Sequence, residues 1–410
     1  VLWIVLGNVI GGSLLAWLIL AGRAREITQK LDVMTMPEFL QERYGVKWVK
    51  VIAAMIIFVF LLPYSASVFK GLGHLFEVNF NISYGTALMF MIFITGIYLI
   101  MGGYFAVTLT DFIQGIIMIT GVIVMTLILT GKAGGFFNTF AHIKQNYVLH
   151  MPPENRPGFL MLFSLIFMTS FGTWGLPQMV QKFYAIKNVR VIKTAAIVTT
   201  VFALIISFAA YFTGAMSHVF FDSVPLLGGQ PAFDMIVPLL LKNYLPNAFM
   251  VLILILVLSA SMSTLSSLIL VSASAVAIDI HKGYINPGIS QKKSLLLMRV
   301  LSSIFIILSF IIARYKFNFI VTLMSLSWGA VAGSFMAPYM YGLFWKKTTP
   351  AGMYAGMFSG LGIAVSMFFI LGPDNAPIAA TLAILVPFLV VPLVSCFTKP
   401  VSQEILDKIF

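Results

Sequence analysis

Residues 246–279 read PNAFMVLILILVLSASMSTLSSLILVSASAVAID, and this stretch decides the fold class of the chain. It carries no Asp, Glu, Lys or Arg before Asp279, and it exceeds the roughly 20 apolar residues that cross a bilayer as a helix. Its middle, Ser259–Ser267, is nevertheless dense in hydroxyl groups. The stretch therefore predicts a membrane-spanning helix with polar side chains at its centre.

The composition of the whole chain agrees with a membrane protein. Of its 410 residues, 60% are hydrophobic and only 9% are charged, whereas a soluble domain carries about 25% charged residues. A single cysteine, Cys396, excludes a disulfide framework, an iron–sulfur cluster and a thiolate zinc site. The net charge of +12 is explained by basic cytoplasmic loops rather than by binding to nucleic acid.

Apolar segments fill nearly the entire chain, so we predict an all-α integral membrane protein with about 11 transmembrane helices. The expected organisation is one transmembrane domain over residues 1–397 and a short cytoplasmic tail over 398–410. A Gly-Gly bend at 101–104 is expected to separate two of the spans. The predicted spans are 1–22, 48–76, 83–101, 103–131, 158–181, 193–216, 246–279, 294–313, 318–345, 350–371 and 376–397.

The distribution of basic residues predicts the orientation of the chain. If Val1 lies outside and each span crosses once, the inner loops hold 18 of the 25 Lys and Arg residues, Lys50 among them, and the outer loops hold seven, Lys70 among them. This bias places the first residue outside and the C-terminus in the cytoplasm of a cell (plasma) membrane protein. A Thr-x-x-Glu capping box at Thr35 and Glu38 predicts a helix in the first inner loop. The outer loops 132–157 and 217–245 are each long enough for a short capping helix.

Asp111 is an ionisable residue inside a predicted span. It follows Gly103 by eight residues, which places it roughly 12 Å into its helix. Ionisable side chains are costly in lipid and usually functional, and a carboxylate beside the hydroxyls of Thr108 and Thr110 suits Na⁺ or a proton. The alternative is a carboxylate at a helix end that binds backbone or water.

The hydroxyl-rich segment offers a second candidate for cation binding. Ala260, Ser263, Thr264 and Ser267 follow a spacing of i, i+3, i+4 and i+7, so they share one helix face. Hydroxyl oxygens and a carbonyl are hard ligands of the kind that small cations prefer. The alternative is close helix packing, because small residues line membrane helix interfaces in any case.

The span 158–181 is predicted to be a broken helix. Gly172, Gly175 and Pro177 fall within six residues and interrupt the hydrogen-bond ladder. Backbone groups freed inside a membrane must line a cavity or be buried in protein, and broken helices form substrate sites in secondary transporters. A proline kink without a ligand is the alternative. Further polar positions within spans, each of which could be structural, are Tyr64, Ser65, Ser67, Ser325 and Trp328.

Signatures of other function classes are absent from the sequence. It contains no zincin, nucleophile-elbow, nucleotide-binding or dinucleotide-binding pattern, so it is not predicted to be an enzyme and requires no cofactor. No Arg ladder or TVGYG-like filter marks a voltage sensor or channel. His218 and Asp222 are close in sequence, but the residues around them read as an outer loop rather than a metal site.

Five motifs, in order along essentially the whole chain, resemble the sodium:solute symporter family, which includes proline, pantothenate, sialic acid and sodium/glucose symporters. They are the inner loop TMPEFL…RYG, the GGYFAVTLTDFIQG stretch, the broken helix WGLPQ, the serine-rich helix SASMSTLSS and the loop GLFWKKTTPAG. The resemblance implies a leucine-transporter-like fold of two inverted five-helix repeats. In this register the first span is similar to core helix two, so we expect core helix one to precede Val1.

The resemblance also implies site residues. Na⁺ is expected as the coupling ion, bound by the Ala260 carbonyl and the hydroxyls of Ser263 and Thr264, with further ligands from core helix one. Asp111 corresponds to an aspartate near the sodium exit path or a second ion site. The implied substrate-binding residues are Tyr64, Ser67, Ser170, Thr173, Trp174, Gln178, Ser325 and Trp328.

The function implied is sodium-coupled symport of a small organic solute by alternating access. The sequence of the broken helix favours proline, pantothenate or a similar small carboxylate. The alternatives are a symporter-like transmembrane sensor and a proton-coupled member of the same fold. The expected partners are the solute, Na⁺ and the lipid bilayer, and the oligomeric state is not predicted.

Overall fold

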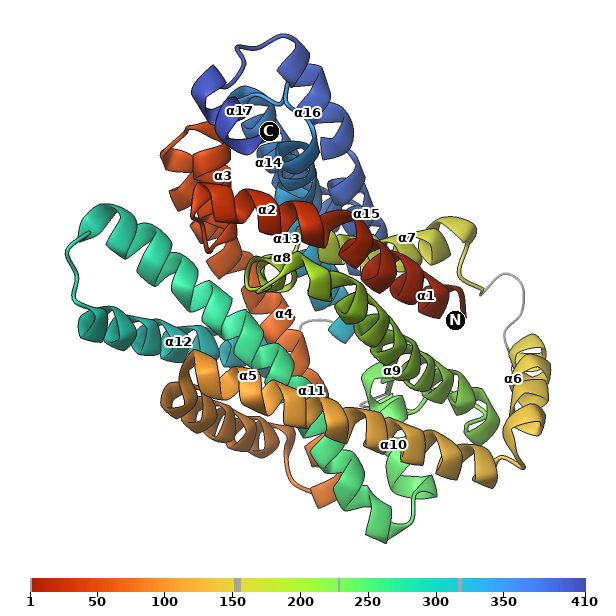
Figure 1. The fold of residues 1–410 in the computed structure, drawn as a ribbon. Coiled ribbons are helices and arrows are strands. Elements are labelled where there is room, and N and C mark those ends of the chain that lie inside the picture. Colours follow the sequence, from red (N-terminus) through yellow and green to blue (C-terminus); the bar gives the residue numbers. More distant parts are fainter. Residues whose placement is uncertain (1, 151–155, 228, 316–318) are drawn as a thin grey trace.

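The computed structural model describes residues 2–150, 156–227, 229–315 and 319–410, and helices make up almost all of them (Figure 1). Glycines at turns and capping side chains at helix starts divide the first half of the chain into successive helices. These elements are α1 (Leu2–Gly7), the π-helix η1 (Asn8–Ala21), α2 (Gly22–Leu31), α3 (Met36–Tyr44), α4 (Trp48–Phe80), α5 (Tyr84–Lys132), α6 (Phe136–His150), α7 (Phe159–Phe171), the 3-10 helix η3 (Gly172–Gly175) and α8 (Pro177–Tyr184).

The second half contains the segment 217–245, which was predicted as an outer loop, and the remaining helices. A two-stranded antiparallel hairpin, in which Leu227 pairs with Gln230, lies in that loop. The elements are η4 (Val189–Val191), α9 (Ile192–Phe220), β1 (Leu226–Leu227), β2 (Gln230–Pro231), η5 (Phe233–Met235), α10 (Ile236–Tyr244), α11 (Asn247–Ser274), the π-helix η6 (Ala275–Ile285), α12 (Gln291–Arg314), α13 (Ile320–Phe344), α14 (Pro350–Leu371), η7 (Pro373–Asn375), α15 (Ala376–Leu385), α16 (Pro387–Cys396) and α17 (Gln403–Ile409).

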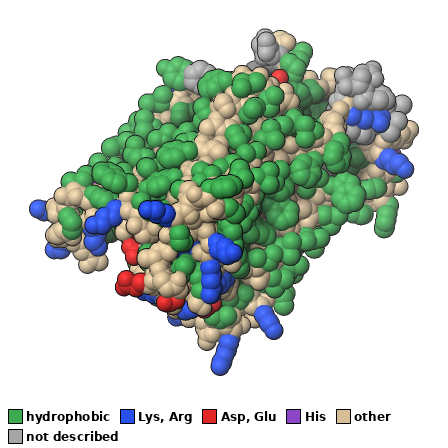
Figure 2. Space-filling model, turned by 90° about the horizontal axis from the view of Figure 1, so that it is seen from above, with side chains coloured by type: hydrophobic (Ala, Val, Ile, Leu, Met, Phe, Trp, Pro, Cys, Tyr) green, Lys and Arg blue, Asp and Glu red, His purple; other side chains and the backbone are tan. Residues whose placement is uncertain are grey.

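The helices are long and apolar enough to cross a membrane. Within the described residues, nine qualify singly, and the bent pair Phe159–Gly175 and Pro177–Tyr184 makes a tenth. A shorter apolar helix over Tyr84–Tyr98 corresponds to the remaining predicted span. Hydrophobic side chains form a broad band across the face shown in Figure 2, with Lys and Arg gathered toward its ends, as expected for a surface that contacts lipid.

The helix α5 contains two of the predicted spans. The side chains of Tyr98 and Thr110 hydrogen-bond to one another, although a straight helix would separate them by about 18 Å. The chain therefore turns back between them, and Figure 1 shows the two limbs of α5 running in opposite directions. This agrees with the expected bend near the Gly-Gly pair, whose own side-chain surroundings lie outside the described residues.

The helix α13 lies at the centre of the bundle, where small residues allow close helix contacts. A Cβ on Gly360 of α14 would lie only 2.1 Å from the Gly333 carbonyl oxygen of α13. A Cβ on Gly333 would in turn lie 2.8 Å from the Ala383 carbonyl oxygen of α15. Such close contact between backbones is typical of membrane helices, which associate through packing rather than the hydrophobic effect.

Several local predictions are confirmed, and two lysines were assigned to the wrong part of the chain. Thr35 and Glu38 form the predicted capping box at the start of α3. The segments 132–157 and 217–245, which were predicted as long outer loops, contain the helices α6 and α10. Lys70, which was counted with the outer loops, instead lies inside α4 and is buried, because α4 continues to Phe80. Lys50, counted with the inner loops, also lies buried within α4.

Candidate functional site: a hydroxyl face and a broken helix

The predicted cation ligands of α11 lie on one half-buried face. Ala260, Ser263 and Thr264 are all partly exposed in the structure, whereas Ser259 and Ser266 are buried. The Thr264 hydroxyl donates to the Ala260 carbonyl at 3.0 Å, which leaves its lone pairs available to a cation. Ala260, Ser263 and Thr264 thus form a hydroxyl face of α11, on which hydroxyl and carbonyl oxygens lie together, as the helical spacing predicted.

The aspartate of α5 reaches the same face. The Ser263 side chain of α11 lies beside the Asp111 carboxyl group, and the positive charge of Lys182 of α8 is near enough to act on that group. The two helices approach closely about two to three turns further along, since a Cβ on Gly121 of α5 would lie 2.9 Å from the Leu256 Cβ of α11. The structure therefore brings together two sodium candidates, Asp111 and Ser263, that are 152 residues apart in the sequence.

Polar atoms around Asp111 remain available to a ligand. Its Oδ1 is buried without a hydrogen-bond partner among the described residues, and the same holds for Oε1 of Gln114 one turn later. Buried oxygen atoms that lack a donor are costly, so a structure that keeps them requires an explanation. A bound cation or water would satisfy both oxygens.

The broken helix passes beside the central helix α13. The chain bends by 45° between the limb that ends at Gly175 and the limb that starts at Pro177. A Cβ on Gly175 would lie 2.8 Å from the Ala332 Cα and 2.7 Å from the Met336 Cβ, so only glycine fits there. The predicted break is therefore present, and it packs directly on α13.

Among the predicted substrate residues of the broken helix, Gln178 is the one whose polar side-chain atoms are most available to a ligand. It lies in the first turn of α8 with only 4% of its surface exposed. Neither its Nε2 nor its Oε1 has a hydrogen-bond partner in the described part of the chain. An amide offers two donors and an acceptor, so this side chain could bind both a carboxylate and an ammonium group.

Two aromatic candidates, Tyr64 and Trp328, contact one another beside the broken helix. The Tyr64 ring of α4 packs edge-on against the Trp328 ring of α13, with 5.6 Å between centroids. The Trp328 ring also lies 3.6 Å from the position that a Cβ on Gly172 would take. The Trp328 indole Nε1 is buried without a partner among the described residues. Tyr64 and Trp328 are thus brought together next to the broken helix.

Other predicted substrate residues make contacts within the protein. The Ser170 hydroxyl bonds to Oδ1 of Asn8 at 3.2 Å, and Trp174 donates its indole N–H to the Gly11 carbonyl at 3.0 Å. These two side chains therefore point toward η1 rather than toward α13. The hydroxyls of the three remaining candidates donate to backbone carbonyls of nearby residues: Thr173 to Ser170, Ser67 to Tyr64 and Ser325 to Val321.

Two serines next to the predicted ones were missed as substrate candidates. Ser65 and Ser327 are fully buried, and neither hydroxyl has a hydrogen-bond partner in the described ranges. Ser65 lies two residues from the predicted Ser67, and Ser327 lies two residues from the predicted Ser325. The two members of each pair therefore lie on different sides of their helix. The sequence contained no signal that separates them, because all of these serines lie in similar apolar surroundings.

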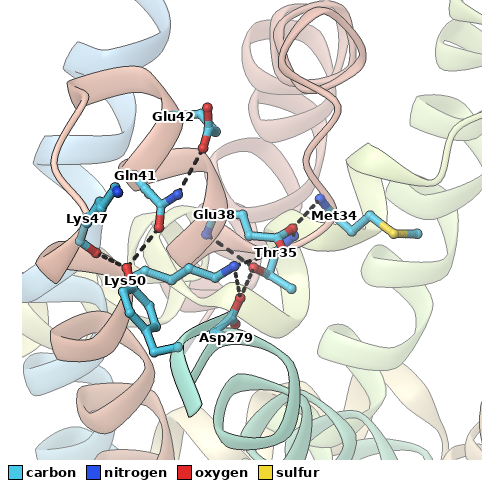
Figure 3. A network of polar contacts seen from close by, with 9 residues as sticks. Met34, Thr35, Glu38, Gln41, Glu42, Lys47, Lys50 and Asp279 are labelled. Atoms are coloured by element: carbon cyan, nitrogen blue, oxygen red, sulfur yellow. Dashed lines mark hydrogen bonds and ion pairs between the residues drawn. The ribbon is translucent and has the colours of Figure 1, made fainter. Parts of the chain in front are cut away.

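A buried polar network anchors the C-terminal end of the α11–η6 helix (Figure 3). Asp279 has no exposed surface, accepts from the Thr35 hydroxyl at 2.9 Å and lies 3.5 Å from the Lys50 ammonium group. Lys50 also pairs with Glu38 at 3.1 Å. Tyr284 donates to the backbone carbonyl of Lys47 at the start of α4. The helix with the hydroxyl face is thereby tied to α3 and α4.

A second buried ion pair lies further along α4. The Lys70 ammonium group is 2.8 Å from Oδ2 of Asp234, which belongs to η5 in the segment predicted as a long outer loop. The Asp234 carboxylate also accepts from the backbone N–H of Ile320, the first residue of α13. The outer loop is thus fastened to both α4 and α13. A lysine inside an apolar span was the only sequence signal for this contact.

Together, the fold and these sites describe a membrane transporter: a helix bundle with a broken helix at its centre and a hard-oxygen face beside it. The chain matches the family model "SSF: Sodium:solute symporter family" over residues 1–360. It belongs to the sodium:solute symporter family.

The relatives are transporters. The chain is 29% identical to the high-affinity proline transporter PutP of Bacillus subtilis (strain 168), over 99% of this chain and 85% of that protein. It is 27% identical to the sodium/proline symporter of Escherichia coli (strain K12), over 87% of this chain and 72% of the relative. The predicted class, a transporter rather than an enzyme, is confirmed by this family membership and these relatives.

Solved structures share the fold. A Na⁺-coupled sialic acid symporter in a substrate-bound outward-open state superposes with a TM-score of 0.72 at 16% identity, covering 98% of this chain and 91% of that one. Mhp1, a nucleobase-cation-symport-1 family transporter, superposes with a TM-score of 0.55 at 14% identity, covering 100% and 89%. The predicted leucine-transporter-like fold is confirmed, and Na⁺ as coupling ion fits the family.

Proposed function

We propose that this chain couples the movement of Na⁺ to the uptake of proline or a closely similar small amino acid by alternating access. The observation that carries the proposal is the meeting of Asp111 with the hydroxyl face of α11. It places a carboxylate, hydroxyls and a carbonyl at one point of the bundle. The relatives named as proline transporters supply the solute class.

In this proposal, the cation is bound by the Ala260 carbonyl and the hydroxyls of Ser263 and Thr264. Asp111 provides a second or exit position that it shares with Ser263. Oxygen ligands with little net charge suit Na⁺, and one carboxylate offsets its charge in a medium of low dielectric constant. Protons are the competing coupling ion, because a carboxylate alone can also carry a proton.

The solute site is proposed between the broken helix, α4 and α13. Gln178 and the Trp328 indole N–H have unused donors that suit the carboxylate of proline, and the Tyr64 and Trp328 rings suit its pyrrolidine ring. Ser67, Ser325, Ser170, Thr173 and Trp174 remain proposed contacts only if their present bonds to the protein rearrange. A bound zwitterion would then satisfy buried groups that otherwise lack partners.

The family implies a multi-pass protein of the plasma membrane, and the basic-residue bias supports an orientation with Val1 outside and the C-terminus in the cytoplasm. We propose one transporter domain over 1–397, with the segment 398–410 folded against its inner face. The helix α17 in that segment packs on α2 and α3, and the Phe410 ring lies 4.9 Å from the Arg23 guanidinium carbon.

The decisive experiment is uptake of radiolabelled proline by proteoliposomes under an imposed gradient of Na⁺, K⁺, choline or protons. We expect accumulation only with Na⁺, and we expect a Thr264→Ala variant to require more Na⁺ than wild type or the Thr264→Ser control. Accumulation driven equally by protons would overturn the Na⁺ site. If no solute accumulates but ligand binding persists, the sensor alternative gains support.

A further inference from the structure

The first limb of α5 and the end of α12 form a seam on the flank of the bundle. These two helices lie side by side in the structure, at the lower left of Figure 1. The seam is fixed at one end by Tyr84, whose hydroxyl donates to the Ala313 carbonyl at 3.0 Å. Because α5 starts and α12 ends here, this end of the seam lies at one surface of the membrane.

An apolar groove runs along the seam within the membrane. It has a volume of about 390 Å³ and is lined by residues that include Phe93, Gly96 and Ile97 of α5 and Ile306 and Ile307 of α12. A Cβ on Gly96 would find no atom within 4 Å, so this glycine leaves the groove open. On a surface that faces lipid, such a groove accepts a hydrocarbon chain.

A polar pocket of about 370 Å³ lies at the end of the same seam, and its lining includes Ser83, Gly85, Thr86 and Arg314. Arg314 is exposed, and no carboxylate in the described ranges forms an ion pair with it. A Cβ on Gly85 would lie 3.2 Å from Nη1 of Arg314, so the glycine leaves room for the guanidinium beside the first turn of α5. The pocket therefore presents a positive charge beside two hydroxyl groups.

The distance between the polar pocket and the apolar groove matches the distance from the headgroup to the acyl chains of one phospholipid. Gly85 precedes Gly96 by 11 residues and Ile307 precedes Arg314 by seven, which separates the pocket from the groove by about 10–16 Å along the helices. Half of the hydrocarbon core measures about 15 Å. Arg314 therefore lies at the depth of lipid headgroups, and the groove lies at the depth of the acyl chains of the same leaflet.

We propose that the seam between α5 and α12 is a binding site for an anionic phospholipid. The headgroup phosphate binds the Arg314 guanidinium, which suits phosphate oxygens through paired N–H donors. The hydroxyls of Ser83 and Thr86 lie in the same pocket. One acyl chain fills the groove at Gly96. This site is separate from the ion and solute sites and does not depend on which solute is carried.

The test is native mass spectrometry of the detergent-solubilised protein titrated with dioleoylphosphatidylglycerol, with dioleoylphosphatidylcholine in parallel. We expect Gly96→Leu, which projects a side chain into the groove from a position where a Cβ meets no atom within 4 Å, to lower phosphatidylglycerol occupancy at least about fivefold. Arg314→Gln should weaken binding about tenfold and remove the preference for the anionic lipid. A melting curve of each variant in detergent without added lipid verifies folding.

Two matched controls make the result specific. Gly362→Leu adds the same side chain on α14, where a Cβ also meets no atom within 4 Å, and Lys132→Gln removes an exposed cation at the far end of α5. Both controls should bind lipid like wild type. Equal loss in the test and control variants, or no loss in folded Gly96→Leu and Arg314→Gln, would overturn the site. Binding of glycerol 3-phosphate as tight as that of the lipid would also overturn it.

Discussion

Replacing Lys50 by Met should destabilise the protein through the network that it joins. Methionine keeps most of the apolar stem but removes the ammonium group, which lies 3.5 Å from Asp279 and 3.1 Å from Glu38. Asp279 has no exposed surface, so the change leaves a buried carboxylate without its counter-charge. Breaking a buried ion pair from one side costs about 3–5 kcal/mol. Because the Thr35 hydroxyl still bonds to Asp279, we expect the free energy of unfolding to fall by the lower end of this range, about 3 kcal/mol.

A double-mutant cycle separates this pairing from simple loss of packing. Asp279→Asn alone leaves Lys50 paired with Glu38 and should cost about 1–2 kcal/mol. The double variant contains neither charge, so its cost should fall short of the sum by about 1–3 kcal/mol. The measurement is equilibrium unfolding in mixed detergent micelles, followed by tryptophan fluorescence.

The control is Lys47→Met, which removes an exposed charge three residues earlier and should change the unfolding free energy by less than about 0.5 kcal/mol. Strict additivity of the two substitutions would refute the reasoning. So would a Lys50→Met variant that is as stable as the Lys47→Met control.

Three further predictions follow from the sites and the packing. Asp111→Asn should raise the Na⁺ concentration needed for half-maximal uptake about tenfold, since it removes one charge near the cation; an unchanged sodium dependence would contradict this role. Gln178→Leu should raise the KM for proline about 10–100-fold while Na⁺ dependence persists, because a bond to a carboxylate is lost; uptake assays at saturating Na⁺ measure it. Gly360→Ala should lower the melting temperature through overpacking of about 1–3 kcal/mol or more against Gly333, whereas Gly362→Ala on the same helix should leave it unchanged.

The local features of this fold were predictable because each has a nearby cause in the chain. The capping box at Thr35 needs only residues three apart, and the break in the span 158–181 needs only Gly172, Gly175 and Pro177. The hydroxyl face of α11 follows from helical periodicity. In each case the responsible residues are neighbours, so a single helix determines the outcome.

The contacts that define the site were less predictable because they join distant segments. Asp111 was chosen for its depth in a span, yet its contact with Ser263 depends on the close approach of α5 to α11. Lys70 was assigned to a loop, because nothing local shows that Asp234 of the outer loop would meet it inside the bundle. The length of a span and the burial of a charge are fixed by tertiary packing.

The choice among neighbouring serines shows the same limit at smaller scale. The sequence favoured Ser67 and Ser325, whose hydroxyls bond to the backbone of their own helices. Ser65 and Ser327 are the ones whose hydroxyls lack partners within the described residues. Rotation of each helix about its axis decides which serine faces the interior, and an evenly apolar helix contains no periodic signal for that rotation.

The two buried lysines of α4 also constrain how the protein fits its membrane. Lys50 and Lys70 are 20 residues apart, so their helix positions differ by about 30 Å, which equals the thickness of a typical hydrocarbon core. Each is held by carboxylates of other segments, Lys50 in the first turn of α4 and Lys70 ten residues before its last residue. Because both charges are buried within the protein, the bilayer contacts neither of them, and lipids with shorter or longer chains would have to deform around this helix rather than draw its lysines to the membrane surface.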